Sequence, residues 1–231
     1  MTHLHYFPVG IGLATLFAAI LLGLFLLLQI GLLSRAYSAL GLDPRVATLA
    51  LFGSLLGSYI NLPLLHLPEE RIVSREVVEI FGVPFLAPVT AEWPGTILAI
   101  NVGGAVIPIL LSFYLLMRYD LWGFGALATA IVAFVVHRLA TPVPGMGISV
   151  PTFAPPLLAA VVALALSRRF AAPLAYISGS LGVLIGADLL NLGVLRSLGA
   201  RVASIGGAGT FDGIFLTGVI AVLLASLVAN R

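Results

Sequence analysis

The sequence predicts an all-α, polytopic helical membrane protein of about seven transmembrane helices, with a short hairpin-like insertion outside the membrane. Of the 231 residues, 61% are hydrophobic and 9% are charged, and long apolar runs alternate with short polar or Pro/Gly-rich segments. Soluble domains carry about 25% charged residues, so this composition excludes one. We expect a single integral membrane domain over residues 1–231, in contact with membrane lipid.

Charge and cysteine content exclude several functions. Each of the 11 basic residues is arginine, and a formal net charge of +2, scattered over loops, does not predict nucleic acid binding. The absence of cysteine excludes disulfides and thiolate catalysis. Glu69 and Glu70 lack the spacing of a metal-ligand set, so we expect no metal and no cofactor. The sequence sets no oligomeric state.

Two spans are expected before the insertion. The first covers residues 11–33, because this apolar run is far longer than that of a secretory signal. The second opens with Asp43 as the N-cap and Pro44 at the first helical position, and is expected to run to about Leu65.

Polar residues form a stripe on this second helix. Ser54, Ser58 and Asn61 fall on one helical face, beside a close-packing Gly53–Gly57 pair. They are either hydrogen-bonding groups between helices or the lining of a cavity.

Residues 67–95 form the one long hydrophilic insertion. Val, Ile and Phe around Gly82 predict a hairpin, which we expect at the membrane surface. The five remaining spans are expected at residues 96–117, 122–136, 155–166, 172–195 and 213–228. With seven spans, Arg35, Arg45, Arg118, Arg168 and Arg169 fall on one side, so the positive-inside rule favours an N-terminus outside the cytoplasmic membrane.

A Pro/Gly-rich segment at residues 141–156 is unsuited to regular helix. It is either a loop or irregular backbone that folds back to line a wet cavity, with Pro144 near its centre. His137, at the end of the preceding span, is either an interfacial residue or a proton carrier.

Two aspartates adjoin the last apolar segments. Asp188 lies within the sixth span, where an ionised carboxylate is costly and therefore indicates a site. Asp212 precedes the seventh span and is either an N-cap or a partner of Asp188. On the helical wheel, Asp188 and Asn191 lie away from the seam of glycines at positions 179, 182, 186 and 193.

The two aspartates predict acid–base chemistry. Consecutive antiparallel spans bring the end of one toward the start of the next, and two neighbouring carboxylates share a proton, so one activates water while the other protonates a carbonyl oxygen. We therefore expect Asp188 and Asp212 to be catalytic, acting on a transmembrane peptide substrate. Seven further residues are expected to support the site or bind substrate: Asn101, His137, Pro144, Asn191, Gly206, Gly207 and Gly209.

Four motifs carry a family resemblance. NVGGAVIP at residues 101–108, TPVPGMGI at 141–148, GADLLNL at 186–192 and SIGGAGTFDGIF at 204–215 resemble signatures of a prokaryotic membrane protein family known as a domain of unknown function. The resemblance covers most of residues 51–224 and implies a prokaryotic, multi-spanning membrane protein. It implies no activity.

More distantly, the two-aspartate arrangement is similar to the presenilin-like and prepilin-peptidase-like intramembrane aspartyl proteases. Those enzymes carry Gly-x-Gly-Asp at one catalytic acid, whereas this chain has Gly186-Ala187-Asp188. The resemblance implies peptide-bond hydrolysis by the Asp188 and Asp212 pair.

Two other classes of function remain open. In a proton- or cation-coupled carrier of a small solute, Asp188 is the ion site and Asn61, Asn101 and Asn191 supply neutral oxygens along the path. Broken helices at Pro108 and in the Pro/Gly-rich segment suit that reading. In a non-catalytic subunit or assembly factor, the glycine stripes serve protein interfaces.

Overall fold

The computed structural model describes most of the chain. The described residues are 19–23, 39–67, 70–80, 83–93, 95–143, 147–195, 202–207 and 213–229. Of the expected first span, only residues 19–23 are among them, and these are helical. The rest of that prediction lies outside the described residues.

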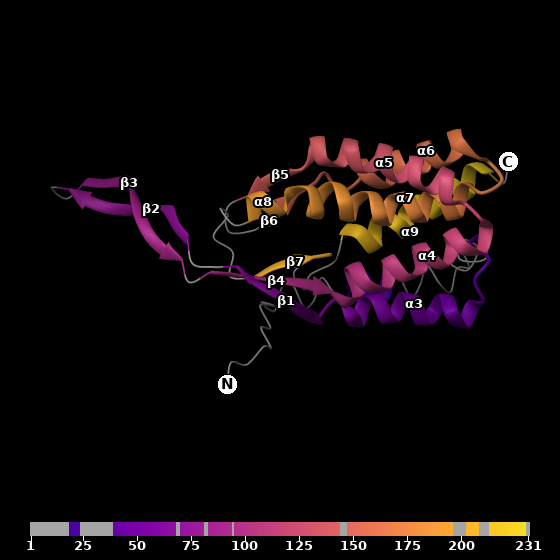
Figure 1. Cartoon of the computed structure of the whole chain (residues 1–231), viewed down its shortest axis with the longest axis horizontal. Coiled ribbons are helices and arrows are strands. Elements are labelled where there is room, and N and C mark those ends of the chain that lie inside the picture. The colour runs from indigo at the N-terminus through magenta and orange to yellow at the C-terminus, as the bar shows by residue number, and fades with distance from the viewer. Residues whose placement is uncertain are drawn as a thin grey trace.

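The helices form one body around a central helix, α7 (Figure 1). Around it pack α4 (Ile107–Tyr119), α5 (Trp122–Leu139), α6 (Ala154–Leu166) and α9 (Gly213–Ala229). Every residue of α7 (Ala171–Val183) except Leu181 is buried. Because α7 has no exposed face, it has no amphipathic period, as expected of a helix enclosed by its neighbours.

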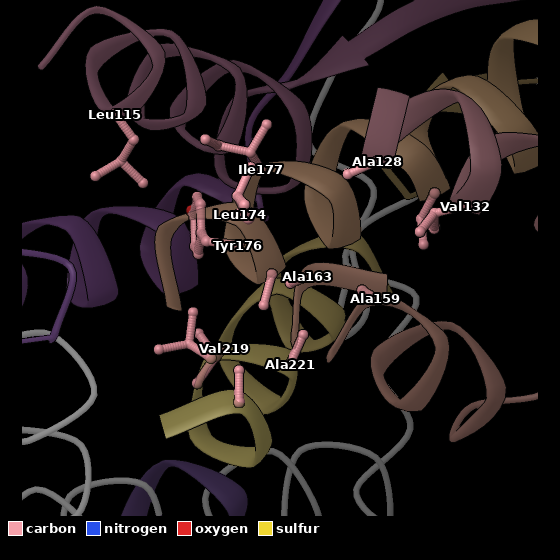
Figure 2. Close-up of a cluster of buried hydrophobic side chains, with 14 of the residues drawn as sticks. Leu115, Ala128, Val132, Ala159, Ala163, Leu174, Tyr176, Ile177, Val219 and Ala221 are labelled. Carbon is pink, nitrogen blue, oxygen red and sulfur yellow. The ribbon is translucent and has the colours of Figure 1, made fainter. Parts of the chain in front are cut away.

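Small residues let the helices approach closely. The buried core combines Leu174, Tyr176 and Ile177 of α7 with many alanines from its neighbours, including Ala128, Ala159 and Ala221 (Figure 2). Interfaces built from Ala and Gly bring backbones together, which replaces the contact area that larger side chains would provide.

The second predicted helix is shorter than expected. α3 (Pro44–Gly57) begins as predicted, since the Asp43 carboxylate accepts the backbone N–H of Arg45 at 2.8 Å. The prediction that it continues to about Leu65 is wrong, because the chain turns after Gly57 and becomes strand β1 (Asn61–Leu67). Pro63 cannot donate to a helical ladder, so a helix through this position was disfavoured.

A three-stranded sheet caps the end of the helical body. β1 pairs antiparallel with β4 (Thr96–Asn101), and β4 pairs parallel with β7 (Val202–Ile205), in the order β1-β4-β7. The expected third span thus begins as strand β4, passes through a π-helical turn, η1 (Val102–Val106), and only then becomes α4.

The insertion is a hairpin, as predicted. β2 (Glu70–Ile80) and β3 (Val83–Trp93) pair antiparallel along their full length. The hairpin continues from the three-stranded sheet and projects beyond the helical body (Figure 1).

The Pro/Gly-rich segment also contains strands. β5 (Thr141–Val143) and β6 (Gly147–Ser149) form a short antiparallel pair, and Ile148 of β6 packs on the buried core. β6 therefore lies against the helical body, as part of a strand pair and not as irregular backbone. That this segment lines a wet cavity stays a prediction.

These strands correct the predicted fold class. The protein is mostly helical, but it is not all-α. Within the described residues, three helical stretches are long and apolar enough to cross a membrane: Val102–Tyr119, Trp122–Leu139 and Ala171–Val194. α6 and α9 are apolar but shorter. About seven spans were expected, and three stretches among the described residues are full-length candidates. The first expected span lies mostly outside the described residues, β1 shortens the second, and α6 and α9 are helices of fewer than 18 residues.

Candidate functional site

The central helix is interrupted where it carries Asp188. α7 passes into a π-helical turn, η2 (Leu184–Asp188), then a 3₁₀ turn, η3 (Leu189–Asn191), and ends in α8 (Leu192–Leu195). A π-turn inserted in a helix is frequently a functional feature, since it changes the direction of the side chains that follow. Asp188 is the last residue of the π-turn and is half-buried.

The carboxylate of Asp188 is held by the end of a strand. Its Oδ2 accepts the backbone N–H of Gly206 at 2.7 Å. Gly206 directly follows β7, and Gly206 and Gly207 both have positive φ, +86° and +92°. Two successive residues in this region require glycine, so the sequence pair is explained by the turn that points an amide at Asp188.

Asn191 stabilises the helix interruption. Its Nδ2 lies 3.0 Å from the Gly186 carbonyl oxygen and 2.9 Å from that of Ala187, and 3.2 Å from Nδ1 of His137. The interrupted turn frees carbonyl groups that the regular helix would have used, and the Asn191 amide supplies a donor for them. His137, from the end of α5, is thereby joined to the same turn.

A second polar cluster lies at η1, the π-turn between β4 and α4. Asn101, at the end of β4, is fully buried. Its Nδ2 donates to the Ser58 carbonyl at 2.7 Å and to Oδ1 of Asn61 at 2.9 Å, while its Oδ1 accepts the N–H of Gly104 at 2.8 Å. Ser204 of β7 donates to the same Asn61 oxygen at 2.6 Å.

β7 connects the two clusters. Its Ser204 bonds to Asn61, and two residues later Gly206 bonds to Asp188. A Cβ added to Gly206 would lie 2.7 Å from the backbone nitrogen of Ala105 in η1. The end of β7 is therefore threaded between the two π-turns, and only glycine fits there.

The predicted glycine seam divides into separate contacts. A Cβ at Gly182 or Gly186 would meet Val132 or Ala133 of α5, but one at Gly179 would meet α6 and α9. Gly193 faces open space. The expected glycine stripe therefore does not pack on a single neighbour, since Gly179 and Gly182, both within α7, already face different helices.

The structure places some predicted site residues together and leaves others outside its description. Asp188, Gly206, Asn191 and His137 gather at the interruption of the central helix, and Asn101 lies at the start of η1. Asp212, Gly209 and Pro144 lie outside the described residues, so the proposed Asp188 and Asp212 pair stays a prediction. Within the described residues, no group of three or more His, Asp or Glu could hold a metal ion.

Sequence reasoning missed Ser204. It lies in a stretch read as part of a glycine-rich loop, yet it forms a side-chain bond to a residue 143 positions earlier. The available signal was weak: Val202 and Ile205 are β-branched residues that favour a strand, but the four-residue segment has no apolar–polar alternation. Its partner, Asn61, was read as part of a helical stripe.

Fold and site together define a mostly helical protein that has, within the described residues, three helical stretches long enough to span a membrane and a polar cluster beside each of two π-turns. Residues 55–224 match the family model described as "Protein of unknown function (DUF1614)", and the chain belongs to that family. No curated protein and no solved structure matches the chain.

Proposed function

We propose that this protein is an intramembrane aspartyl protease in which Asp188 and Asp212 form the catalytic pair. The observation that carries the proposal is the hydrogen bond between Asp188 and Gly206, the residue that directly follows β7. Within the described residues, β4 is the strand that pairs with β7, which leaves the opposite edge of β7 as a sheet edge. An extended peptide can add to such an edge through its backbone.

A peptide bound at this edge would run toward the carboxylate. Helical peptide bonds are protected by their own hydrogen bonds, so a transmembrane substrate must become extended before it is hydrolysed. An edge strand stabilises the extended form, and β7 ends where Gly206 contacts Asp188. The arrangement supports hydrolysis more directly than it supports simple binding of a helix.

The topology of α9 supports a role for Asp212. α9 runs antiparallel to α7, so its first turn and the interruption at Asp188 lie toward the same end of the helical body (Figure 1). Asp212 immediately precedes Gly213, the first residue of α9. In the proposed reaction, the ionised carboxylate takes a proton from water as the water attacks the carbonyl carbon, and the protonated one donates to the carbonyl oxygen.

The test uses an active-site probe, because a transition-state analogue binds only an assembled site. A transmembrane peptide with a hydroxyethylene group in place of one peptide bond, carrying a photoreactive label, should label the reconstituted protein. Asp188→Asn and Asp212→Asn should each abolish labelling and cleavage of the parent peptide. Asp120→Asn is the matched control, since Asp120 is exposed, lies at the other end of the body and has φ +49°, which Asn tolerates. Undiminished labelling of either site variant would overturn the proposal.

The pair can also be tested by distance. The chain has no cysteine, so Asp188→Cys with Asp212→Cys introduces the only two thiols. A disulfide or a short bifunctional cross-link should form within one molecule if the positions are paired. The control pair is Asp188→Cys with Asp120→Cys.

We propose a prokaryotic cytoplasmic membrane as the location, with the arginine-rich helix ends in the cytoplasm and the N-terminus outside. Among the described helix ends, Arg45, Arg118, Arg168 and Arg169 flank the end away from the sheet, and Arg138 flanks the other. Arginine near helix ends favours the cytoplasmic side.

A second candidate is a proton- or cation-coupled carrier, favoured by the interruption of the central helix at Asp188. Carriers bind ions where a helix is broken, and here η2 interrupts the apolar stretch Ala171–Val194, while η1 forms the first turn of Val102–Tyr119. Reconstituted vesicles would then show proton flux that is lost in Asp188→Asn and unaffected by Asp212→Asn. The second variant separates the carrier from the protease.

A further inference from the structure

The Asn191 side chain has one donor group that serves three acceptors. Its Nδ2 lies within hydrogen-bonding distance of the backbone oxygens of Gly186 and Ala187 and of Nδ1 of His137. An amide nitrogen carries two hydrogens and accepts no hydrogen bond, so Asn191 is the donor in all three contacts. The opposite orientation of the amide would place its oxygen against two backbone oxygens, and the network therefore sets the orientation.

This network also sets the protonation of His137. Because Asn191 donates, Nδ1 of the imidazole must accept, and a ring nitrogen accepts only when it carries no proton. His137 is therefore neutral in this arrangement, with its one proton on Nε2. The side chain is half-buried in the last turn of α5, beside the interruption that carries Asp188.

Two charged groups lie at this end of α5. Arg138 is the next residue, with its guanidinium 5.3 Å from the centre of the Phe134 ring, and Asp188 lies on η2, which packs against α5. The Asp188 carboxylate accepts the Gly206 amide. The other ionisable side chains on helices packed against α5 are Tyr176 of α7 and, on α4, Tyr114, Arg118 and Tyr119. Since arginine stays protonated, a change of pH acts at this end through His137 and Asp188.

We propose that His137 is a positioning residue for Asp188 and acts through Asn191. The neutral imidazole holds the amide so that it donates to two backbone oxygens of η2, and Asp188 is the last residue of that turn. The same bonds thereby keep the carboxylate opposite the Gly206 amide. A proton on Nδ1 puts a hydrogen where Asn191 needs an acceptor, and this releases the turn. The effect on catalysis rests on the function proposed for Asp188, whereas the hydrogen bonds do not.

The tautomer can be measured directly by NMR of the full chain in detergent micelles. The chain has four histidines, so replacing His3, His5 and His66 by glutamine leaves one imidazole signal after ¹⁵N-histidine labelling. Near neutral pH, Nε2 of His137 should carry the proton and Nδ1 should carry none. A proton on Nδ1 would overturn the proposal, whether or not the protein cleaves peptides.

Two substitutions of His137 separate hydrogen bonding from packing. Asparagine places an oxygen acceptor near the position of Nδ1 and cannot be protonated, whereas leucine fills space without an acceptor. Hydrogen exchange of the Gly206 amide reports the position of the Asp188 carboxylate without any need for activity. His137→Leu should exchange about tenfold faster than the wild type, and His137→Asn should remain close to it. Equal exchange in the two variants, or the reverse order, would mean that His137 does not act as an acceptor.

The pH profile is the third readout. As the pH falls, protection of the Gly206 amide in the wild type should decrease over the interval in which NMR shows that His137 becomes protonated. His137→Asn should lack this decrease, and an identical profile in both chains would assign it to Asp188 and overturn the proposal. Labelling by the active-site probe should follow the same order among the variants. If no chain is labelled while exchange behaves as expected, the protease is refuted and the positioning of Asp188 is retained.

Discussion

Asn101 is the residue on which the packing of the sheet against α3 depends. It is fully buried and contacts a carbonyl, a side chain and a backbone amide from three different elements. Most buried polar groups must be paired, and an amide side chain with one oxygen and one nitrogen satisfies several neighbours at once. The same site explains why Asn101 begins the NVGGAVIP motif, since its oxygen caps the first turn of η1.

Replacing Asn101 by Ala should destabilise the fold strongly. The change leaves the Ser58 carbonyl and the Gly104 amide without their present partner, so the expected cost is roughly 2–4 kcal/mol. Unfolding in mixed micelles, followed by tryptophan fluorescence, measures it. Ser112→Ala is the matched control, since the buried Ser112 hydroxyl has no hydrogen-bond partner among the described residues and its loss should cost little. Equal effects of both changes would contradict this account.

Gly206 serves two purposes, a positive φ and a close approach to η1. Gly206→Ala should cost roughly 3 kcal/mol, from left-handed strain plus the overlap of its Cβ with Ala105. Gly147→Ala isolates the strain, because Gly147 has φ +110° and open space around it. The difference in unfolding free energy between the two variants reports the overlap. A difference near zero would mean that β7 does not lie against η1.

At the scale of elements, a π-turn that follows a regular strand or helix is the recurring feature. The chain twice passes from regular structure into a π-turn, at η1 and η2, and each time a short polar side chain satisfies the backbone groups nearby. In a regular helix these backbone groups would bond to one another, and no polar side chain would be needed to satisfy them. The interruptions thus place Asn101 and Asp188 on either side of the end of β7.

Contact between α5 and η2 depends on Gly186. A Cβ at this position would lie 2.4 Å from the backbone oxygen of Ala133, so the two elements would have to separate. Gly186→Ala should therefore cost about 1–3 kcal/mol and weaken the probe labelling described above, because Asp188 follows two residues later. Gly193→Ala, on the same chain segment but in open space, should be neutral or slightly stabilising. Both variants replace a glycine by alanine, so the difference between their unfolding free energies reports the contact with α5 and not helix propensity.

At the scale of the molecule, the helical body has two unlike ends. The sheet, the two π-turns and the projecting hairpin lie at one end, and the turns between α4 and α5 and between α6 and α7 lie at the other (Figure 1). All five glutamates belong to the insertion. The proposed site therefore lies at the end of the helical body from which the hairpin projects.

Two glycines on opposite ends test this arrangement. Gly123 begins α5 and Gly193 lies in α8, and both face open space. In cells, Gly193→Cys should react with a membrane-impermeant maleimide added outside, and Gly123→Cys should react only after permeabilisation. The cysteine-free parent gives no background. Labelling of both from the same side would contradict a membrane crossing between them.

The sequence by itself determined the helices that remain regular. The bounds expected for α5, α6 and α9 agree with the structure within a few residues, as do the Asp43 cap and the hairpin in the insertion. These elements depend on local hydrogen bonds and short-range turns, so contiguous sequence contains their determinants. Asp188 was also identified from sequence, because a carboxylate in an apolar run is conspicuous.

Only the tertiary structure decided the strands of the β1-β4-β7 sheet and the partners of the polar residues. Asn61 fits a helical stripe as well as a strand, and the choice is made by its pairing with Asn101, 40 residues later, and with Ser204. Apolar residues at 96–100 likewise become a strand because β1 and β7 lie on either side. Strand hydrogen bonds join distant segments, so their energy is not encoded in any local window of sequence. For the same reason, the sequence did not predict that the backbone amide of Gly206 would bond to Asp188. That contact depends on where β7 ends in the fold.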